Sequence, residues 1–193
     1  MLKNSFSETS HNSKAKEILK ENMEDLKKAI RDIPDFPKKG IIFKDITPLL
    51  QNSVLFKKAI NRLSEQFKSK NIEVVVSVES RGFILGAAIA HKLGAGFVPV
   101  RKKGKLPYKT HRATYELEYG KDTLEIHQDA IRRGARVLII DDLLATGGTL
   151  SAVIDLIKKM GGKIAGIGFL IELTFLKGRE RNKDYKIFSL IKF

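Results

Sequence analysis

The sequence predicts an α/β protein with a central, mainly parallel sheet flanked by helices. Runs of branched apolar residues, typical of strands buried on both faces, alternate with amphipathic helical segments, as in parallel strands joined by crossover helices. The clearest strand is residues 137–140, and a second lies within residues 72–79. A short polar turn and then a helical pattern follow each of them. Ligands of such sheets bind outside the carboxyl ends of the strands, so we look for function there.

Composition narrows the class of protein. A chain of 193 residues is most simply one domain with a sizeable core. It contains no cysteine, which excludes disulfides and thiolate zinc sites, and its four histidines are scattered without the spacing of metal ligands. No apolar run reaches membrane-spanning length, and the N-terminus lacks the apolar core of a signal peptide. We therefore expect a cytoplasmic protein that does not bind a membrane.

The net charge of +14, from 36 basic and 22 acidic residues, favours an anionic partner. Nucleic acid, a membrane surface and small phosphorylated substrates are all anionic, so charge alone does not choose among them. A phosphate site needs basic residues but does not require so large an excess. Part of the excess can therefore belong to a lysine-rich surface.

The first third of the chain is predicted to begin with a disordered or loosely ordered extension, residues 1–22, which are polar. Apolar residues then recur at helical spacing from Met23 to Ile33 and predict a helix that Pro34 ends. Proline and glycine break regular structure after it, around a short apolar segment at residues 41–43. A second amphipathic helix is predicted over residues 56–67, with Asn52 or Ser53 placed to cap it.

The rest of the chain continues the alternation. The strand at residues 72–79 leads through a turn into a helix over residues 83–93 and a strand over residues 97–101. A basic loop with glycine and proline then begins at Lys102, and it is either functional or an ordinary solvated loop. The remaining predictions are strands or a hairpin at 114–119 and 123–127, a strand at 164–170, a solvated basic turn at 177–183 and a strand at 186–190.

The joint after residues 137–140 carries the strongest functional signal. Asp141 and Asp142 stand where the strand should end, and adjacent carboxylates are costly there unless they face solvent, a cation or ligand hydroxyls. A small, hydroxyl-rich turn at residues 145–149 then opens a helix whose free N–H groups suit a phosphate. Turn and capping chemistry would explain Gly147 and one threonine but not the two acids. Neither a Walker A loop nor a dinucleotide fingerprint is present.

A second joint of the same kind follows the strand at residues 72–79. Ser80-Arg81-Gly82 turns into the next helix and leaves its N-terminus free for an anion, with Arg81 as a cation beside it. The alternative is that Arg81 simply pairs with Glu79. The repeated geometry favours the anion-binding interpretation.

The stretch from Val137 to Thr149 resembles the phosphoribosyl diphosphate (PRPP) binding motif of the type I phosphoribosyltransferases. Other segments resemble those of the adenine-specific members of this family, and they follow the family's order from about Met23 to the C-terminus. These segments are 35–46, 80–83, 101–107, 117–121 and 172–174.

The resemblance implies that the protein transfers the 5-phosphoribosyl group of PRPP to adenine, giving AMP and diphosphate in purine salvage. It implies a homodimer that uses Mg²⁺, held mainly by substrate and water rather than directly by the protein. It also implies a single domain, residues 23–193, with a small hood at about 34–50 and a mobile lid at about 102–113. A PRPP-sensing regulator that binds nucleic acid is a second hypothesis, but the chain shows no helix-turn-helix pattern. Transfer to hypoxanthine or guanine is a third.

The resemblance also assigns roles at the PRPP site, where diphosphate is displaced from the ribose through an oxocarbenium-like transition state. Asp141 and Asp142 would stabilise the developing cation and bind the ribose hydroxyls. Arg81, Arg101 and Lys105 are candidates to bind the departing diphosphate. The loop that would hold the 5′-phosphate consists of Ala145, Thr146, Gly147, Gly148 and Thr149.

The family resemblance places the base in the hood and assigns a third catalytic group. Glu118 matches the family's candidate acid/base for the purine ring, although an ordinary polar strand residue is the alternative. Phe43 would stack on one face of adenine and Leu143 on the other, whereas the sequence alone would assign both to the core. The backbone of Ile42 and Lys44 would bind the edge of the base. These features of the hood, together with the segment around Glu118, argue against a 6-oxopurine substrate.

Overall fold

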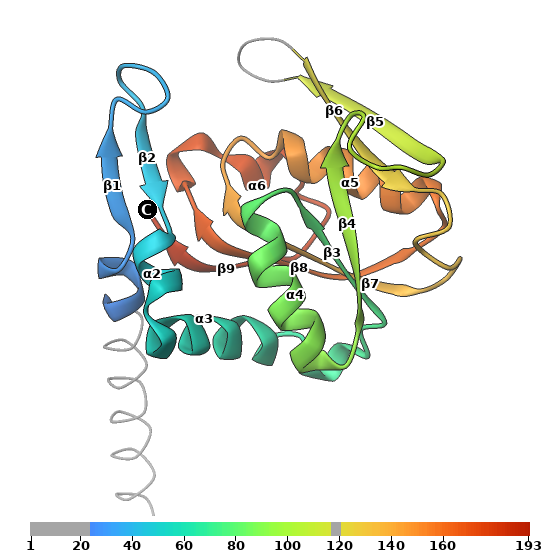
Figure 1. Ribbon diagram of the computed structural model, residues 1–193, viewed down its shortest axis with the longest axis horizontal. Coiled ribbons are helices and arrows are strands. Elements are labelled where there is room, and N and C mark those ends of the chain that lie inside the picture. The colour runs from blue at the N-terminus through green and yellow to red at the C-terminus, as the bar shows by residue number, and fades with distance from the viewer. Residues whose placement is uncertain (1–23, 117–120) are drawn as a thin grey trace, which may run out of the picture. The chain divides into compact units, whose positions relative to one another are not determined.

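The structure is a computed structural model, and it describes residues 24–116 and 121–193 (Figure 1). The chain divides into two compact units, with the boundary between Ala59 and Ile60. The predicted extension, residues 1–22, and the predicted acid/base Glu118 lie outside the described residues. The hood and lid of a single domain remain predictions. No helix in the described part of the chain is both long and apolar enough to cross a membrane.

The first unit contains a short helix at residues 24–28 and a two-stranded antiparallel sheet. The sheet pairs β1 (Arg31–Pro34) with β2 (Ile42–Asp45), so Ile33 lies opposite Phe43. The prediction of a helix as far as Ile33 was therefore wrong. Helical spacing in a short segment is a weak preference, and pairing with a second strand overrides it.

Two helices follow this sheet. They are α2 (Thr47–Gln51) and α3 (Ser53–Glu65), and the second begins in the first unit. Asn52 Oδ1 accepts hydrogen bonds from the backbone N–H groups of Val54 and Leu55, both at 3.1 Å. Of the two predicted capping residues, Asn52 therefore caps α3, by satisfying N–H groups that have no partner within the helix.

The second unit is built on a seven-stranded sheet in the order β5-β6-β4-β3-β7-β8-β9. Five neighbouring strands run parallel to one another, namely β4, β3, β7, β8 and β9. At one edge of the sheet, β6 runs antiparallel to β4, and β5 runs antiparallel to β6. This arrangement confirms the predicted mainly parallel sheet. The strands are β3 (Val74–Val78), β4 (Gly96–Lys102), β5 (Thr110–Glu116), β6 (Lys121–His127), β7 (Arg136–Leu144), β8 (Lys163–Glu172) and β9 (Ile187–Lys192).

Helices cover both faces of this sheet (Figure 1). The crossover helix α4 (Arg81–Leu93) joins β3 to β4 and α5 (Gly148–Lys159) joins β7 to β8. Gly86 of α4 packs directly on Ser77 of β3, whereas the neighbouring Val76 belongs to the core under α5. Successive residues of a strand point to opposite faces, so the two helices lie on opposite sides. The shorter elements are η1 (Lys68–Lys70), η2 (Thr174–Leu176) and α6 (Gly178–Arg181).

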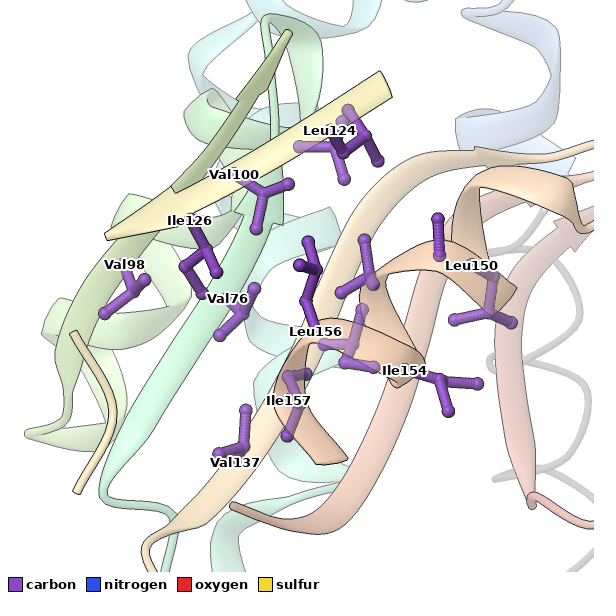
Figure 2. Packing of buried hydrophobic residues seen from close by; sticks show 14 of the residues in the cluster. Val76, Val98, Val100, Leu124, Ile126, Val137, Leu150, Ile154, Leu156 and Ile157 are labelled. Carbon is purple, nitrogen blue, oxygen red and sulfur yellow. The ribbon is translucent and has the colours of Figure 1, made fainter. Parts of the chain in front are cut away.

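The core between the sheet and α5 consists almost wholly of branched side chains (Figure 2). The buried strand residues pack against one apolar face of α5. Burying each such side chain stabilises the fold by about 1.5–3 kcal/mol. This packing fixes α5 against the sheet and so positions its N-terminus. The residues labelled in Figure 2 are Val76, Val98, Val100, Leu124, Ile126, Val137, Leu150, Ile154, Leu156 and Ile157.

Two further predictions need correction, one about a strand and one about a turn. First, β7 does not end before the acidic pair, because it continues to pair with β8 through Leu144, which lies opposite Glu172. Second, residues 177–183 are not a solvated turn. Gly178 and Asn182 are buried there, and the Arg179 guanidinium donates to Glu172 Oε2 at 2.6 Å and to Ile187 O at 2.6 Å.

The basic segment after β4 is shorter than the predicted lid. Lys102 is the last residue of β4, and Thr110 begins β5, opposite His127 of β6. Residues 103–109 are therefore the part of the predicted lid that lies outside strands. Whether this segment moves over a substrate remains a prediction.

Candidate active site

A small cavity lies between the end of β7 and the start of α5. Its volume is about 60 Å³. Gly147 precedes the helix in the left-handed region, with φ of 83°, and no side chain caps the helix start. The N–H groups there remain available for an anion. The residues lining the cavity are Asp141, Leu143, Leu144, Ala145, Thr146, Gly147, Gly148, Thr149, Leu150 and Phe169, which include all five residues of the predicted phosphate loop.

The phosphate loop, residues 145–149, is held from behind by the segment that contains α6. A Cβ atom on Gly147 would lie 2.5 Å from Gly178 O, so this contact requires glycine as well as the positive φ. Asn182 is only 6% exposed, and its Nδ2 donates to Gly147 O at 3.1 Å and to Gly178 O at 3.3 Å. The Ser151 hydroxyl lies 3.1 Å from Gly147 O and 3.0 Å from Asn182 Oδ1, and it donates to one of them at a time.

Sequence reasoning missed this support. Asn182 lies 35 residues from Gly147 and in a charged run whose composition is typical of a surface turn. Nothing in its spacing indicates a link to the loop. The interaction follows from the fold, because β8 and β9 are parallel neighbours of β7 and return the chain to the same edge of the sheet.

The acidic pair lies beside the cavity and beside the start of α4. Asp142 is 7% exposed, and its backbone N–H donates to Asp141 Oδ1 at 2.9 Å. Arg81 Nη2 lies 2.8 Å from Asp142 Oδ2. Charge attraction rather than a directed hydrogen bond holds this contact, because no donor in the described part of the chain is aligned with Oδ2. Of the surroundings that would make such carboxylates tolerable, Asp142 therefore has a cation and not solvent.

This geometry shifts the pKa values of both acids. Burial raises the pKa of Asp141 well above its ordinary value, and the neighbouring Asp142 charge raises it further. Burial also raises the pKa of Asp142, although Arg81 opposes that shift. The two carboxyls are too close to titrate independently, so they act as a pair that holds charge reluctantly in the absence of a ligand. Such perturbed pairs are typical of functional sites.

A close backbone approach joins the two strand–turn–helix joints. A Cβ atom on Gly82 would lie 2.4 Å from Asp141 Oδ1, closer than real side chains pack. Glycine at position 82 therefore lets the start of α4 approach the acidic pair. The structure brings the Ser80-Arg81-Gly82 turn and the acids together, and Arg81 forms an ion pair with Asp142.

The other two cations predicted to bind diphosphate share one carboxylate. Arg101 Nε and Nη2 each lie 3.0 Å from Glu79 Oε2, and Lys105 Nζ lies 3.2 Å from Glu79 Oε1. Burial alone would raise the pKa of Glu79. The Lys102 backbone N–H and the two cations outweigh that effect and lower the pKa below its ordinary value.

Tyr115 of β5 is a further residue that sequence reasoning missed. Its hydroxyl accepts a hydrogen bond from Thr149 Oγ1 at 3.4 Å and donates to Asp122 Oδ2 at 3.5 Å. Burial raises the pKa of Tyr115 above its ordinary value, so burial favours the protonated hydroxyl that donates to Asp122. The phosphate loop is thereby linked to the hairpin of β5 and β6, whose first strand includes the end of the predicted lid.

The predicted base-binding residues of the hood lie in the first unit. Ile42 is 55% exposed, and the Phe43 ring contacts the Phe36 ring edge to face, with 5.1 Å between centroids. Lys44 Nζ pairs with Asp32 at 2.6 Å. Its apolar side chain alone would predict that Phe43 is a fully buried core residue. In the structure Phe43 is only partly buried. Its stacking against a base opposite Leu143, which lies in the second unit, remains a prediction.

Known proteins resemble this chain over most of its length. Residues 49–193 match the phosphoribosyl transferase domain family. The adenine phosphoribosyltransferase of Geotalea daltonii is 60% identical over 171 residues, which cover 89% of this chain and 100% of that protein. The crystal structure of adenine phosphoribosyltransferase from Thermoanaerobacter pseudethanolicus is 53% identical, with a TM-score of 0.87 and coverage of 89% of this chain and 99% of that one.

A third relative was crystallised with ligands. The adenine phosphoribosyltransferase of Saccharomyces cerevisiae, complexed with adenine and an imino-altritol bisphosphate, is 42% identical, with a TM-score of 0.83. The match covers 88% of this chain and 98% of that one. More than half of the aligned residues are identical to those of the Geotalea and Thermoanaerobacter relatives, over nearly the whole length of each relative. The chain therefore belongs to the adenine phosphoribosyltransferase family.

Proposed function

We propose that the protein transfers the 5-phosphoribosyl group of PRPP to adenine and forms AMP and diphosphate, a reaction of purine salvage. One observation carries the proposal. A cavity large enough for one phosphate group opens at the N-terminus of α5, directly beside two carboxylates on β7. This arrangement supplies donors for the 5′-phosphate and acceptors for the ribose on a single, rigidly packed joint.

The phosphate loop would bind the 5′-phosphate and so position the ribose. Backbone N–H groups at the start of α5 and the hydroxyls of Thr146 and Thr149 are suitable donors, and the helix dipole favours a negative charge there. Asn182 and Tyr115 hold this loop from two sides, through Gly147 O at 3.1 Å and Thr149 Oγ1 at 3.4 Å. A loop supported in this way loses little entropy when the substrate binds.

The acidic pair would stabilise the positive charge that develops on the ribose. As diphosphate leaves, the anomeric carbon acquires oxocarbenium character, and an ionised carboxylate held nearby lowers the energy of that state. The raised pKa values of Asp141 and Asp142 show that burial opposes their charge in the free protein. Ribose hydroxyls and the developing cation would relieve that penalty, so the interaction should strengthen towards the transition state.

Diphosphate would be received by the cations and by Mg²⁺. Within residues 24–116 and 121–193, no three His, Cys, Asp or Glu side chains gather into a metal-binding set. Mg²⁺ commonly keeps several waters and binds substrate phosphates with only one or two carboxylates. Asp141 and Asp142 fit that mode, as acceptors for the metal's waters. Bound to diphosphate, the ion would neutralise charge on the leaving group.

The hood would hold the base, with Phe43 and Leu143 on its two faces and the backbone of Ile42 and Lys44 at its edge. Glu118 would exchange a proton with the purine ring. The yeast relative that was crystallised with adenine supports adenine as the base. We also propose a homodimer, as the family resemblance implies. Phosphorylated substrates do not cross a bilayer unaided, so we place the reaction in the cytoplasm.

The test is nucleotide formation by the purified protein with PRPP, Mg²⁺ and each purine base in turn. A site arranged for an exocyclic amine leaves its groups unpaired against a carbonyl, and such mismatches discriminate strongly. We expect kcat/KM for adenine to exceed that for hypoxanthine or guanine at least ~100-fold, which corresponds to roughly 2.7 kcal/mol. Preferred use of a 6-oxopurine would contradict adenine as the base. Activity unchanged by chelation of Mg²⁺ would contradict the proposed cofactor.

A further inference from the structure

Glu79 is a buried carboxylate that the proposed reaction does not use. It follows β3 directly, and its side chain is only 7% exposed. Four donor groups converge on it. Its Oε1 accepts from the Lys102 backbone N–H at 2.7 Å, and its Oε2 accepts from Arg101 Nε and Nη2, each at 3.0 Å, and from Lys105 Nζ at 3.3 Å. The carboxylate is therefore saturated on both oxygens.

The two cations around Glu79 are much more exposed than the carboxylate between them. The Arg101 side chain is 35% exposed and that of Lys105 is 51% exposed. Arg101 Nη1 also donates to Lys105 O at 3.2 Å, which folds the turn of residues 102–105 back onto Glu79. The cations are thus reachable from solvent, while their best-directed donors point inward to the protein's own carboxylate.

A diphosphate group that binds these cations must therefore compete with Glu79. A guanidinium recognises a carboxylate or a phosphate through the same fork of two N–H donors, and here Arg101 already uses that fork on Glu79. Lys105 carries three donors on a flexible stem and meets both Glu79 oxygens, so it too is drawn towards the carboxylate. A negative charge this close to the cations also lowers the local positive potential that attracts an anion.

We propose that Glu79 is a positioning residue that occupies Arg101 and Lys105 in the absence of PRPP, and that the diphosphate group of the substrate displaces it from at least one of them. This proposal rests on the function proposed above, in which those cations bind diphosphate. Its consequence is that Glu79 weakens the binding of diphosphate, both as part of PRPP and as the free product. A carboxylate in this role keeps the turn ordered in the free protein and helps the product leave.

Glu125 of β6 provides a matched control within the same segment. It is 1% exposed, and it accepts from the Gly104 backbone N–H at 3.0 Å and from Arg112 Nε at 2.7 Å. It therefore anchors the same turn and carries the same charge, but its cationic partner is Arg112. A comparison of Glu79→Gln with Glu125→Gln separates competition for the diphosphate cations from a general loss of negative charge or of order in the turn.

The experiment is calorimetric titration of inorganic diphosphate with Mg²⁺ into the wild-type protein and the two variants. We expect Glu79→Gln to lower the Kd for diphosphate about fivefold, which is about 1 kcal/mol, and Glu125→Gln to change it less than twofold. In Glu79→Gln, KM for PRPP should fall while KM for adenine stays constant. An unchanged or higher Kd in Glu79→Gln would overturn the proposal, because Glu79 would then hold the cations in place for the ligand.

A second variant pair tests whether Lys105 carries the effect. In a Lys105→Gln background, the gain from Glu79→Gln should shrink, because one of the released cations is gone; full additivity would contradict a shared partner. If Glu79→Gln does not fold, Glu79→Asp, whose shorter side chain holds the carboxylate farther from the same donors, should also lower the Kd, and an unchanged or raised Kd there overturns the proposal. Wild-type protein that makes no AMP would instead contradict the proposed function.

Discussion

Arg81 and Asp142 form an ion pair, with 2.8 Å between Nη2 and Oδ2, that ties the first residue of α4 to the last third of β7. The pair joins the two strand–turn–helix joints of the sheet at one place. A cation predicted to bind diphosphate therefore lies next to an acid predicted to bind ribose. The leaving group and the sugar of one PRPP molecule are neighbours in the same way, so the ion pair would align the two halves of the proposed substrate site.

Replacing either acid should affect turnover more than it affects folding. We expect Asp141→Asn or Asp142→Asn to lower kcat by about ten- to a thousand-fold for the more important acid, the size of effect seen when an electrostatic partner of the transition state is removed. Steady-state kinetics with saturating adenine and PRPP measures this, and circular dichroism checks the fold. Near-normal turnover in both single variants would remove the pair from the mechanism.

The stability of Asp141→Asn should depend on pH in a particular direction. The folded-state pKa of Asp141 is raised, so the folded protein resists ionisation that the unfolded chain allows. Wild-type stability therefore falls as the pH rises from about 3.9, the unfolded value, through the folded value. Asparagine avoids that penalty. We expect its Tm to exceed that of wild type by about 2–4 °C at pH 8, which is about 1 kcal/mol for a chain of this size.

The same measurement supplies its own control. Below about pH 3 the Asp141 carboxyl of the wild type is protonated in both the folded and the unfolded state, so the advantage of Asp141→Asn should disappear there. Asp142→Asn should show less gain at pH 8, because it removes the carboxylate that Arg81 pairs with. A Tm advantage of Asp141→Asn that is equal at about pH 3 and at pH 8 would contradict a raised pKa.

Gly82→Ala should disturb the acidic pair without unfolding α4. The new Cβ would lie 2.4 Å from Asp141 Oδ1 and 3.3 Å from Asp141 Cγ, so that side chain must rotate away from the Asp142 N–H. Alanine is the better helix former by about 1 kcal/mol, which offsets part of the strain. We expect kcat/KM for PRPP to fall about tenfold or more, with little change in Tm.

Gly96→Ala is the matched control for this substitution. A Cβ atom at Gly96 would meet only Glu73 O, at 3.6 Å, which is ordinary contact. Its kcat/KM should remain within about twofold of wild type, since such a contact needs no neighbouring atom to move. Equal losses in the two variants would show that Gly82 matters for the backbone in general and not for its approach to Asp141.

The sequence predicted those features of the fold that depend on local pattern. The run at residues 137–140 is buried in β7, and the helical spacing after Thr149 forms α5, because apolar periodicity directly decides which face of an element is buried. The two strand–turn–helix joints were predicted for the same reason, while their binding of anions stays a prediction. Ile33 shows the limit of such reasoning, since its helical spacing gave way to pairing with Phe43.

Features of the site that depend on distant contacts could not be predicted. The burial of Asp142 depends on β7 pairing beyond the acids and on the approach of α4, neither of which the apolar pattern indicates. The pairing of Glu79 with Arg101 and Lys105 arises because the end of β3 lies beside β4. In each case the charged side chain has several plausible partners in the sequence. The register of the sheet decides which of them lies close enough to pair with it.

Asn182→Ala should weaken PRPP binding specifically. The Asn182 amide donates to Gly147 O and Gly178 O, and its loss leaves these buried carbonyls without that donor, at a cost of about 1–3 kcal/mol in stability. Gly147 is then held less firmly at its φ of 83°. The N–H groups of the phosphate loop would no longer all point into the cavity. Because that loop would bind the 5′-phosphate, we expect KM for PRPP to rise about tenfold, a size in line with the effect of imprecise positioning. KM for adenine should stay nearly constant.

Asn52→Ala is the control that separates this effect from simple destabilisation. Asn52 caps α3 through two N–H groups at 3.1 Å, and removing such a cap costs about 0.5–2 kcal/mol, which overlaps the cost expected for Asn182→Ala. Its Tm should therefore fall by a similar amount, whereas its KM for PRPP should not change, because the cap does not touch the phosphate loop. If both variants raise KM for PRPP equally, the loss follows from reduced stability, and Asn182 has no particular role in holding Gly147. If only Asn182→Ala raises it, the support behind the phosphate loop sets the affinity for the substrate.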